Sequence, residues 1–324
     1  MLSQVPDYPR AGRRAAVLGH PVAHSLSPVL HRAAYAALGL TGWTYDALDV
    51  DEADLPRLVG ERDAGWAGWS LTMPLKRAVR PLLVRESELA EQVGAVNTVL
   101  VAPDGLEGYN TDVHGIVEAF GEALGRSPGE AFGEASGDAA GKGGPGDGAP
   151  VPRRQGVVLG GGATAAAAIA ALAELGCPDP LVHVRSPERA GDLVAAADRL
   201  GVTPRLVPFE AGAMIESVTV ADLVVSTLPA GAADRLVAGG VAAAAAARRP
   251  VLLDVVYDPW PTTLAAAWTA HDAPAVGGFV MLVHQAFGQV HLMTGLRPPV
   301  ARMRAAGEAA LLARAAAPQV PAGR

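Results

Sequence analysis

Residues 156–176 read GVVLGGGATAAAAIAALAELG. GVVL is a short apolar run that predicts a buried strand, the three glycines predict a tight turn, and the alanine-rich remainder predicts a helix. Glycines between a strand and a helix let a dinucleotide pyrophosphate approach the backbone and the free N–H groups of the helix N-terminus. Gly160 and Gly162 fit the first two glycines of that fingerprint, and Ala165 takes the third position, as its GxGxxA form allows. Glycines that serve only a tight turn remain the alternative.

Short apolar runs recur on both sides of this stretch and alternate with longer helical stretches. This rhythm is typical of β-α-β units around mostly parallel sheets, so the sequence predicts the α/β class. With 324 residues the chain is too long for one ordinary core, and two domains are expected. The apolar runs that predict strands are residues 15–19, 156–160, 181–184, 222–227 and 251–257.

The composition is that of a globular protein, with 50% hydrophobic and 18% charged residues. The 26 basic and 33 acidic residues give a net charge of −7, which argues against a nucleic acid partner. Cys177 is the only cysteine, so no internal disulfide can form, and the first residues lack the apolar run of a secretory signal. Residues 156–173 carry no charge, but their glycines and alanines suit a strand, turn and helix better than a membrane span. We expect a cytoplasmic protein without a transmembrane segment, and we assign no metal ligands.

Residues 125–150 contain nine glycines and three prolines in 26 positions. Such a segment has too little apolar surface to offset the entropy of ordering it, so we interpret it as a disordered insertion or linker. It follows a helix expected to begin near Asp112 and precedes the strand at Gly156, where a domain boundary is expected. A lid or interaction loop is the functional alternative.

The end of the next predicted strand bears on the choice of cofactor. An NAD site normally places Asp or Glu about 20 residues after the glycines, where it binds the ribose 2′-hydroxyl. Here the strand is followed by Arg185 and Ser186, with Arg189 close behind. An arginine attracts a 2′-phosphate through charge-assisted hydrogen bonds, so we expect NADP(H). Glu188 leaves an alternative open, because it could pair with an arginine or cap a helix.

Four short segments of the first half carry polar side chains close to the ends of predicted strands. They are HSLSP (24–28), SLTMPLK (70–76), AVNT (95–98) and YNTD (109–112). Each has a structural explanation: Ser27 and Thr72 can cap helices, Asn97 can satisfy a turn, Asp112 can cap the next helix, and Lys76 can be a solvated helix residue. Open α/β sheets, however, place ligand sites at strand ends, which favours one shared site.

Seven motifs, in this order and spacing, resemble the shikimate dehydrogenase family: HPVAHSLSP, SLTMPLK, GAVNT, GYNTD, GGGAT, DVVYDPWPT and GGFVMLVHQ. The resemblance runs from about Val17 to Gly295, apart from the insertion. It implies two α/β domains with the active site in the cleft between them. The N-terminal α/β substrate domain would comprise residues 1–112 with 277–324. The doubly wound Rossmann-type NADP-binding domain would comprise residues 113–276.

The resemblance also implies a role for particular residues. Lys76 and Asp112 would be the catalytic pair, with Pro74 fixing the turn that aims Lys76. Ser25 and Ser27 would bind the substrate carboxylate. The residues expected to bind substrate are Ser25, Ser27, Thr72, Asn97, Tyr257 and Gln285. The residues expected to bind the cofactor are Gly160, Gly161, Gly162, Ala163, Arg185, Ser186, Arg189, Thr227 and Met281.

At four positions the chain departs from the family pattern. Ser70 stands where asparagine is usual, Val184 precedes Arg185 where asparagine is common, Asp258 replaces an asparagine, and Val280 replaces a glycine before Met281. The change at Ser70 concerns a residue that would contact the substrate-binding residues and not the substrate itself. The other three bear on cofactor affinity and on placement of the nicotinamide.

The activity that the resemblance implies is the reversible, NADPH-dependent reduction of 3-dehydroshikimate to shikimate in aromatic amino acid (chorismate) biosynthesis, by a monomer or homodimer. Reduction of a ketone develops negative charge on oxygen, which a positioned lysine can neutralise. One alternative is a quinate/shikimate dehydrogenase that uses NAD, which would be expected to carry an acidic residue in place of Arg185. Another is a catalytically silent nucleotide-binding regulator, which would need neither Lys76 nor Asp112. A scaffolding protein would leave the ordered polar motifs unexplained.

Overall fold

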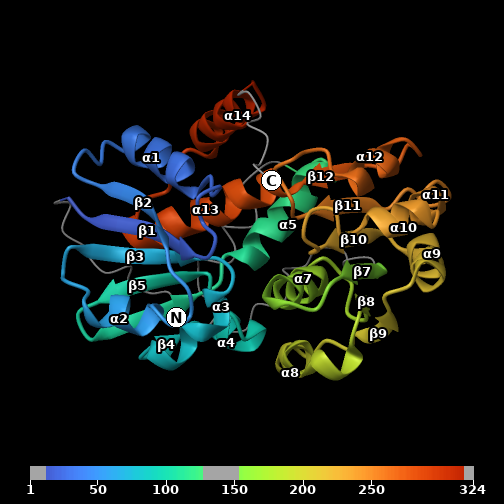
Figure 1. Ribbon diagram of the computed structural model, residues 1–324, viewed down its shortest axis with the longest axis horizontal. Coiled ribbons are helices and arrows are strands. Elements are labelled where there is room, and N and C mark those ends of the chain that lie inside the picture. Colours follow the sequence, from blue (N-terminus) through green and yellow to red (C-terminus); the bar gives the residue numbers. More distant parts are fainter. Residues whose placement is uncertain (1–11, 127–152, 317–324) are drawn as a thin grey trace, which may run out of the picture.

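Two six-stranded sheets lie side by side in the computed structural model, which describes residues 12–126 and 153–316 (Figure 1). Helices α5 (Asp112–Ala123) and α13 (Gly278–Thr294) cross the middle of the molecule between the sheets and pack against each other. The α/β class is therefore confirmed. No helix in the described part of the chain is long and apolar enough to span a membrane.

The first sheet is mixed and has the order β2-β1-β3-β5-β6-β4. β1 is parallel to β2 and β3, β5 is antiparallel to β3 and β6, and β4 is parallel to β6. Its strands are β1 (Arg14–Gly19), β2 (Thr44–Asp49), β3 (Trp66–Leu71), β4 (Arg85–Glu86), β5 (Thr98–Ala102) and β6 (Gly105–Tyr109). The ends of β1, β3 and β6 and the beginning of β5 thus meet at one edge of the sheet.

Helices cover both faces of this sheet because the strand residues alternate between two cores. Ala15 and Val17 of β1 pack with residues of α1, α13 and α14, whereas Ala16 and Leu18 pack with residues of α2, α3 and α4. The helical elements are α1 (Ser27–Ala37), α2 (Leu55–Gly60), α3 (Leu75–Ala78), the 3₁₀ turn η1 (Arg80–Leu82), α4 (Glu88–Val93) and α14 (Val300–Ala316).

The second sheet is parallel throughout and has the order β9-β8-β7-β10-β11-β12. Numbered from β7, this is the 3-2-1-4-5-6 order of a doubly wound fold, with the reversal of strand order between β7 and β10. Its strands are β7 (Gly156–Leu159), β8 (Leu181–Val184), β9 (Arg205–Pro208), β10 (Leu223–Ser226), β11 (Val251–Asp254) and β12 (Ala275–Gly277). The strand predicted over 251–257 ends three residues early, at Asp254.

The four inner strands of the second sheet, β7, β8, β10 and β11, are buried on both faces. Val158 packs on the side of α5, α7 and α8, and its neighbours Val157 and Leu159 pack on the side of α9 to α12. The remaining helical elements are α7 (Ala163–Glu174), the 3₁₀ turn η2 (Pro187–Arg189), α8 (Gly191–Leu200), α9 (Ala211–Val220), α10 (Asp234–Ala238), α11 (Val241–Ala244) and α12 (Thr263–Thr269).

The turn between β7 and α7 needs glycine at its first position. Gly160 has a φ of +118°, and a Cβ there would lie 2.3 Å from the hydroxyl oxygen of Thr227. Both the left-handed backbone and the close neighbour exclude a larger side chain. The predicted strand, glycine turn and helix are therefore all present.

The chain returns to the first sheet where β12 ends and α13 begins. A Cβ on Gly278 would lie 2.0 Å from the carbonyl oxygen of Val255, so α13 starts in backbone contact with the end of β11. From there α13 packs on β3, β5 and α1. The predicted boundaries 1–112 with 277–324 and 113–276 follow this path and stay a prediction. Of the predicted insertion at 125–150, residues 127–150 lie outside the described residues.

Three of the predicted helix caps differ in the structure. Ser27 is the first residue of α1, and its N–H donates to the hydroxyl of Ser25 at 3.2 Å, so the hydroxyl of Ser27 caps nothing. Thr72 makes no capping bond to α3. Asp112 begins α5 without capping it, because the side chain of Asn110 accepts the N–H groups of Asp112 and Val113. The hydroxyls and the carboxylate are therefore left to face the cavity described next.

Candidate active site

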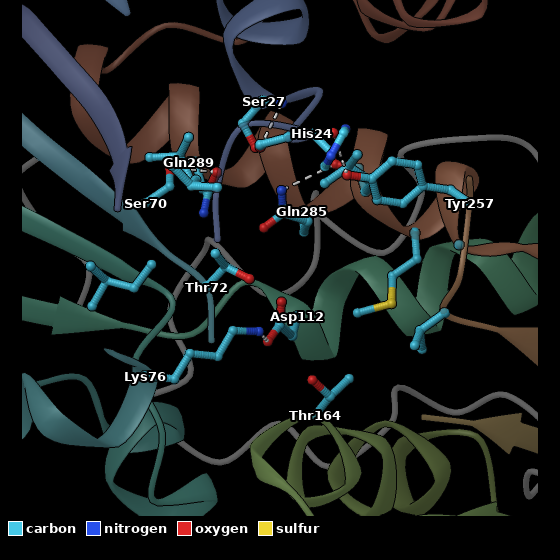
Figure 2. Close-up of a pocket in the computed structure, with 18 of the residues that line it drawn as sticks. His24, Ser27, Ser70, Thr72, Lys76, Asp112, Thr164, Tyr257, Gln285 and Gln289 are labelled. Carbon is cyan, nitrogen blue, oxygen red and sulfur yellow. Dashed lines mark hydrogen bonds and ion pairs between the residues drawn. The ribbon is translucent and has the colours of Figure 1, made fainter. Parts of the chain in front are cut away.

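A cavity of about 280 Å³ lies between the two sheets, at the carboxyl ends of β1, β3, β7 and β11 (Figure 2). It is close to the ~300–1,000 Å³ typical of small-molecule sites. Of the residues predicted to act on or bind ligands, those lining the cavity are Ser25, Ser27, Thr72, Lys76, Asp112, Tyr257, Met281 and Gln285. The structure thus brings both predicted catalytic residues and most predicted substrate residues to one place.

Lys76 and Asp112 form an ion pair inside the cavity. Lys76 Nζ lies 2.5 Å from Asp112 Oδ2, and the two side chains are 15% and 5% exposed. Figure 2 shows the lysine reaching across from α3 to the start of α5. The solvated-helix interpretation of Lys76 is therefore wrong, because its ammonium group is turned inward onto a buried carboxylate.

The backbone around each partner fixes the pair. Lys76 follows Pro74, whose peptide bond with Met73 is cis, and its carbonyl oxygen accepts the N–H of Val96 at 2.8 Å. Asp112 is held where the side chain of Asn110 caps α5, and Asn110 also donates to the carbonyl of Ala95 at 2.9 Å. Segments 70–76, 95–98 and 109–112 are thereby tied together at one sheet edge.

Asn97 lies behind the pair and does not line the cavity. Its amide nitrogen is 2.8 Å from Asp112 Oδ1, 2.9 Å from the hydroxyl of Thr111 and 3.2 Å from Gln285 Oε1. Its oxygen accepts the N–H of Thr111 at 2.8 Å. In this arrangement Asn97 supports the carboxylate of Asp112, and its predicted contact with substrate hydroxyls stays a prediction.

The opposite end of the cavity is formed by hydroxyl groups at the start of α1. Ser25 and Ser27 line the cavity there. His31, one turn into α1, donates from Nδ1 to the Ser27 carbonyl at 2.9 Å and stacks on Tyr45 with ring centroids 3.8 Å apart. Burial lowers the pKa of His31 to about 3, so this histidine is neutral and adds no charge beneath the serines.

Tyr257 closes the side of the cavity that belongs to the second sheet. Its hydroxyl donates to the carbonyl of His24 at 3.4 Å, and burial raises its pKa. Arg314 of α14 donates to the same carbonyl at 2.9 Å and lies 3.4 Å from Asp258, the residue that replaces the family asparagine. Asp258 is thus part of a contact between the two halves of the molecule.

The glycine turn offers backbone groups to an anionic ligand. No side chain caps the N-terminus of α7, and a Cβ on Gly162 would meet no atom within 4 Å, so the backbone is approachable there. Thr227 packs beside the turn and donates to the carbonyl of Leu159 at 2.9 Å. These features fit a dinucleotide pyrophosphate.

Arg185 directly follows β8, Arg189 ends the 3₁₀ turn η2, and both are exposed. β8 pairs in parallel with β7, and Gly160 donates to the carbonyl of His183 at 3.0 Å, so the chain leaves β8 directly beside the glycines. Val184 lies against Gly161, where the family pattern has asparagine. Within the described ranges neither guanidinium has a hydrogen bond or an ion pair, and both are available to a phosphate.

Several cavity residues were not among those predicted. Thr164 reaches up from the first turn of α7 toward Asp112 in Figure 2, and Val255 and His24 also line the cavity. Gln289 lines it too, one helical turn after Gln285. Thr164 stood inside the quoted motif GGGAT, and the i, i+4 spacing from Gln285 was a usable signal for Gln289.

No group of three or more His, Cys, Asp or Glu suited to a metal ion occurs among residues 12–126 and 153–316. The cavity instead presents one buried lysine–carboxylate pair, hydroxyl groups and amides. Such a set can donate and accept a proton at an oxygen atom held beside it.

Comparison with known proteins agrees with this geometry. Residues 17–99 match the family described as shikimate dehydrogenase substrate binding domain, and residues 278–306 match shikimate 5′-dehydrogenase C-terminal domain. The shikimate dehydrogenase (NADP(+)) of Moorella thermoacetica is 34% identical over 291 residues, which cover 89% of this chain and 90% of the relative.

Two solved structures share the fold. Shikimate 5-dehydrogenase from Thermus thermophilus, in complex with NADP(H) and shikimate, has a TM-score of 0.72 and 34% identity, with 92% of this chain and 100% of that chain covered. Quinate dehydrogenase from Corynebacterium glutamicum, in complex with NAD, has a TM-score of 0.74 and 26% identity, with 92% and 99% covered. The fold alone therefore does not separate the two substrates, but sequence identity over nearly the whole length does establish kinship. The chain belongs to the shikimate dehydrogenase family.

Proposed function

We propose that this chain catalyses the reversible, NADPH-dependent reduction of 3-dehydroshikimate to shikimate, a step of aromatic amino acid (chorismate) biosynthesis. The observation that carries the proposal is the buried Lys76–Asp112 pair, 2.5 Å apart in a cavity between the substrate-side sheet and the glycine turn. The names of the Moorella and Thermus proteins support the substrate and the cofactor.

Lys76 serves as the acid and base at the reacting oxygen. When bound, NADPH supplies the hydride that adds to the ketone carbon. The ammonium group of Lys76 gives a proton to the oxygen as negative charge develops there, and the lysine is left as a neutral amine. In the direction of oxidation the amine takes the proton back from the hydroxyl.

Asp112 orients the lysine and shares the substrate hydroxyl. Oδ2 accepts from Lys76, and Oδ1 accepts from Asn97 at 2.8 Å, so the carboxylate keeps one direction relative to the ammonium group. A carboxylate held by two donors can also accept a hydrogen bond from the substrate without changing place.

The other polar groups hold the ring and its carboxylate. Ser25 and Ser27 bind the carboxylate at the far end of the cavity from Lys76. Thr72, Gln285 and Asn97 hold ring hydroxyls, and Tyr257 lines the site from the second sheet. Because these contacts are made in both ground state and transition state, they set the affinity for shikimate more than the rate.

NADP(H) is the expected cofactor. The uncapped start of α7 and the approachable backbone at Gly162 suit the pyrophosphate, and Arg185, Ser186 and Arg189 suit the 2′-phosphate. Gly161, Ala163, Thr227 and Met281 complete the predicted cofactor contacts. The exposed guanidinium of Arg185, in the place where an NAD enzyme carries an acid, favours NADP over NAD.

The alternative of a quinate/shikimate dehydrogenase with NAD is disfavoured by that same arginine, and a silent regulator is disfavoured by the intact lysine–carboxylate pair. We further propose that the protein acts in the cytoplasm, as a monomer or homodimer, and without a nucleic acid partner. The net charge of −7 supports the last point, since it does not favour a polyanion.

The test is to follow the near-ultraviolet absorbance of the reduced nicotinamide with the purified protein. Shikimate and quinate should each be tried with NADP and with NAD. We expect turnover of shikimate with NADP and a much lower kcat/KM for the other three combinations. No turnover of shikimate with either cofactor would contradict the proposal, and preference for quinate with NAD would replace it with the alternative.

A further inference from the structure

A chain of buried hydrogen bonds runs from the core of the first sheet to the catalytic pair. The hydroxyl of Tyr45 donates to Ser70 at 2.6 Å, and Ser70 donates to Gln289 Oε1 at 2.8 Å. Gln289 Nε2 lies 3.1 Å from the carbonyl of Asn97 and 3.2 Å from the hydroxyl of Thr98. Thr98 donates to Asn97 Oδ1 at 2.8 Å, and Asn97 donates to Asp112.

In this series of hydrogen bonds, the carboxylate of Asp112 determines which group donates and which accepts at each step. The carboxylate of Asp112 can only accept, so the nitrogen of the Asn97 amide must face it. The oxygen of that amide then points to Thr98, whose hydroxyl must donate to it. The hydroxyl oxygen of Thr98 is thereby left to accept from Gln289, and Gln289 turns its own oxygen toward Ser70.

Thr98 is the member of this chain that can be tested most cleanly. It is the first residue of β5, is fully buried at 0% exposed, and does not line the cavity. Within the described residues it reaches the cavity only through its bonded neighbours, Asn97 and Gln289. Ser70 and Gln289 line the cavity themselves, so a loss at either position would mix support of Asn97 with direct contact.

We propose that Thr98, itself held by Gln289, is a positioning residue that fixes the amide of Asn97 with its nitrogen toward Asp112. If Thr98 stopped donating, the Asn97 oxygen would lose one of its partners, and rotation of the amide would set that oxygen against the carboxylate. Asp112 would then be less well directed at Lys76. The expected effect on kcat rests on the proposed function, whereas the orientation of the Asn97 amide rests on the geometry alone.

The first test compares Thr98→Val with Thr98→Ser. Valine has the shape of threonine without the hydroxyl, whereas serine keeps the hydroxyl. We expect Thr98→Val to lower kcat about tenfold, as for one lost buried hydrogen bond, with a smaller change in KM for shikimate, and Thr98→Ser to restore most of the rate. The control is Thr294→Val on α13, which removes a hydroxyl whose partners among the described residues are the carbonyl of Val290 and the N–H of Leu296.

The second test does not depend on activity. Solvent exchange of the side-chain amide protons of Asn97 can be followed by NMR and compared with that of Gln92, which lies near the surface. We expect slow exchange for Asn97 in the wild type, faster exchange in Thr98→Val and recovery in Thr98→Ser. Fast exchange of Asn97 in the wild type would overturn the proposal even if Thr98→Val did not fold.

The outcomes separate the two proposals. If the wild type does not turn over shikimate, the proposed function fails and the exchange data alone decide the role of Thr98. If Thr98→Val keeps wild-type kcat, or if Thr98→Ser fails to restore a rate that valine lowers, Thr98 does not act through its hydroxyl and the positioning role is overturned. A loss in Thr294→Val equal to that in Thr98→Val would overturn it as well, because the effect would then be one of general stability.

Discussion

The two ends of the site are built differently. At the substrate end, the groups around Lys76 and Asp112 are buried and bonded to one another through Asn97, Thr98 and Gln289. At the cofactor end, Arg185 is exposed and, within the described residues, has no hydrogen bond or ion pair. The polar groups at the substrate end are thus held by one another, whereas Arg185 at the cofactor end is held by none of the described residues.

This difference separates what each end can control. Groups already fixed in place cost little further ordering in the transition state, so they act mainly on the rate. An exposed arginine must be ordered when the cofactor binds, so it acts mainly on affinity and on the choice between cofactors. Substitutions at the two ends should therefore change different kinetic constants.

Replacement of Lys76 by alanine should have the largest effect. It removes the group that exchanges a proton with the reacting oxygen, so kcat should fall about 10²- to 10⁴-fold while the affinity for NADP changes little. Steady-state kinetics with shikimate and direct titration of NADP measure the two quantities. The control is Arg77→Ala, because Arg77 is the next residue but pairs with Asp192 at 2.9 Å outside the cavity.

A wild-type kcat in Lys76→Ala at saturating shikimate would remove the acid–base assignment. Because alanine leaves the carboxylate of Asp112 buried without its ion pair, the melting temperature should be measured in parallel. A loss of cofactor affinity as large as the loss of rate would show that the substrate end and the cofactor end do not control different kinetic constants.

Ser25→Ala combined with Ser27→Ala should have the next largest effect, and on a different constant. Loss of hydrogen bonds to a charged carboxylate should raise KM for shikimate about 10- to 100-fold, with a smaller change in kcat. The hydroxyl of Ser27 caps nothing, but that of Ser25 accepts the N–H of Ser27 at the start of α1, so the melting temperature should be measured in parallel. The control is Thr41→Ala with Thr44→Ala, which removes two exposed hydroxyls from the same half of the molecule.

An unchanged KM in the double serine variant would mean that the substrate carboxylate binds elsewhere. A fall in kcat as large as the rise in KM would instead mean that the serines also act on the rate, and that the two ends do not control separate constants.

Arg185→Ala probes the cofactor end. Loss of a charge-assisted contact with the 2′-phosphate should reduce the preference for NADP over NAD about 10- to 100-fold and leave kcat at saturating NADP nearly unchanged. The measurement is kcat/KM for both cofactors in wild type and variant. Arg235→Ala, at an exposed position on α10, controls for the loss of one positive charge from the same half. A wild type that prefers NAD, or a variant that keeps the full preference, would contradict the assignment.

Features that depend on residues close together in the sequence could be predicted from the sequence. The strand, glycine turn and helix from Gly156 depend on residues close together in the chain, and β8 ends at Val184 as its apolar run indicates. The pairing of Lys76 with Asp112 came from the family resemblance and is present at 2.5 Å.

The partner of a buried polar group could not be predicted, because that partner often lies far away in the sequence. Ser70 bonds to Gln289 across 219 positions, and nothing in the motif SLTMPLK points to that glutamine. The capping of α5 by Asn110 rather than Asp112 depends on a one-residue shift of the helix start, which the sequence pattern does not resolve. The role of Asn97 behind Asp112 depends likewise on a sheet edge assembled from three separate segments.

His31 is expected to affect stability and not catalysis. Burial lowers its pKa from an ordinary 6.5 to about 3, and its Nε2 has no hydrogen-bond partner in the described structure. Above pH 6.5 the histidine is neutral in folded and unfolded chains, so it contributes no pH dependence. As the pH falls from 6.5 toward 3, His31 becomes protonated in the unfolded chain but stays neutral in the folded chain. The free energy of unfolding therefore decreases by ~1.4 kcal/mol per pH unit.

His31→Phe should therefore flatten this part of the stability curve by one proton while keeping a ring that can stack on Tyr45. Denaturant unfolding at several pH values measures the slope, and the difference between variant and wild type above pH 6.5 gives the packing change separately. His114, whose pKa burial also lowers to about 3, should still contribute its own proton in both proteins. Parallel stability curves for the variant and the wild type would mean that His31 is protonated in the folded state. The start of α1 would then carry a positive charge beneath Ser25 and Ser27, and the substrate end would attract a carboxylate by charge as well as by hydrogen bonds.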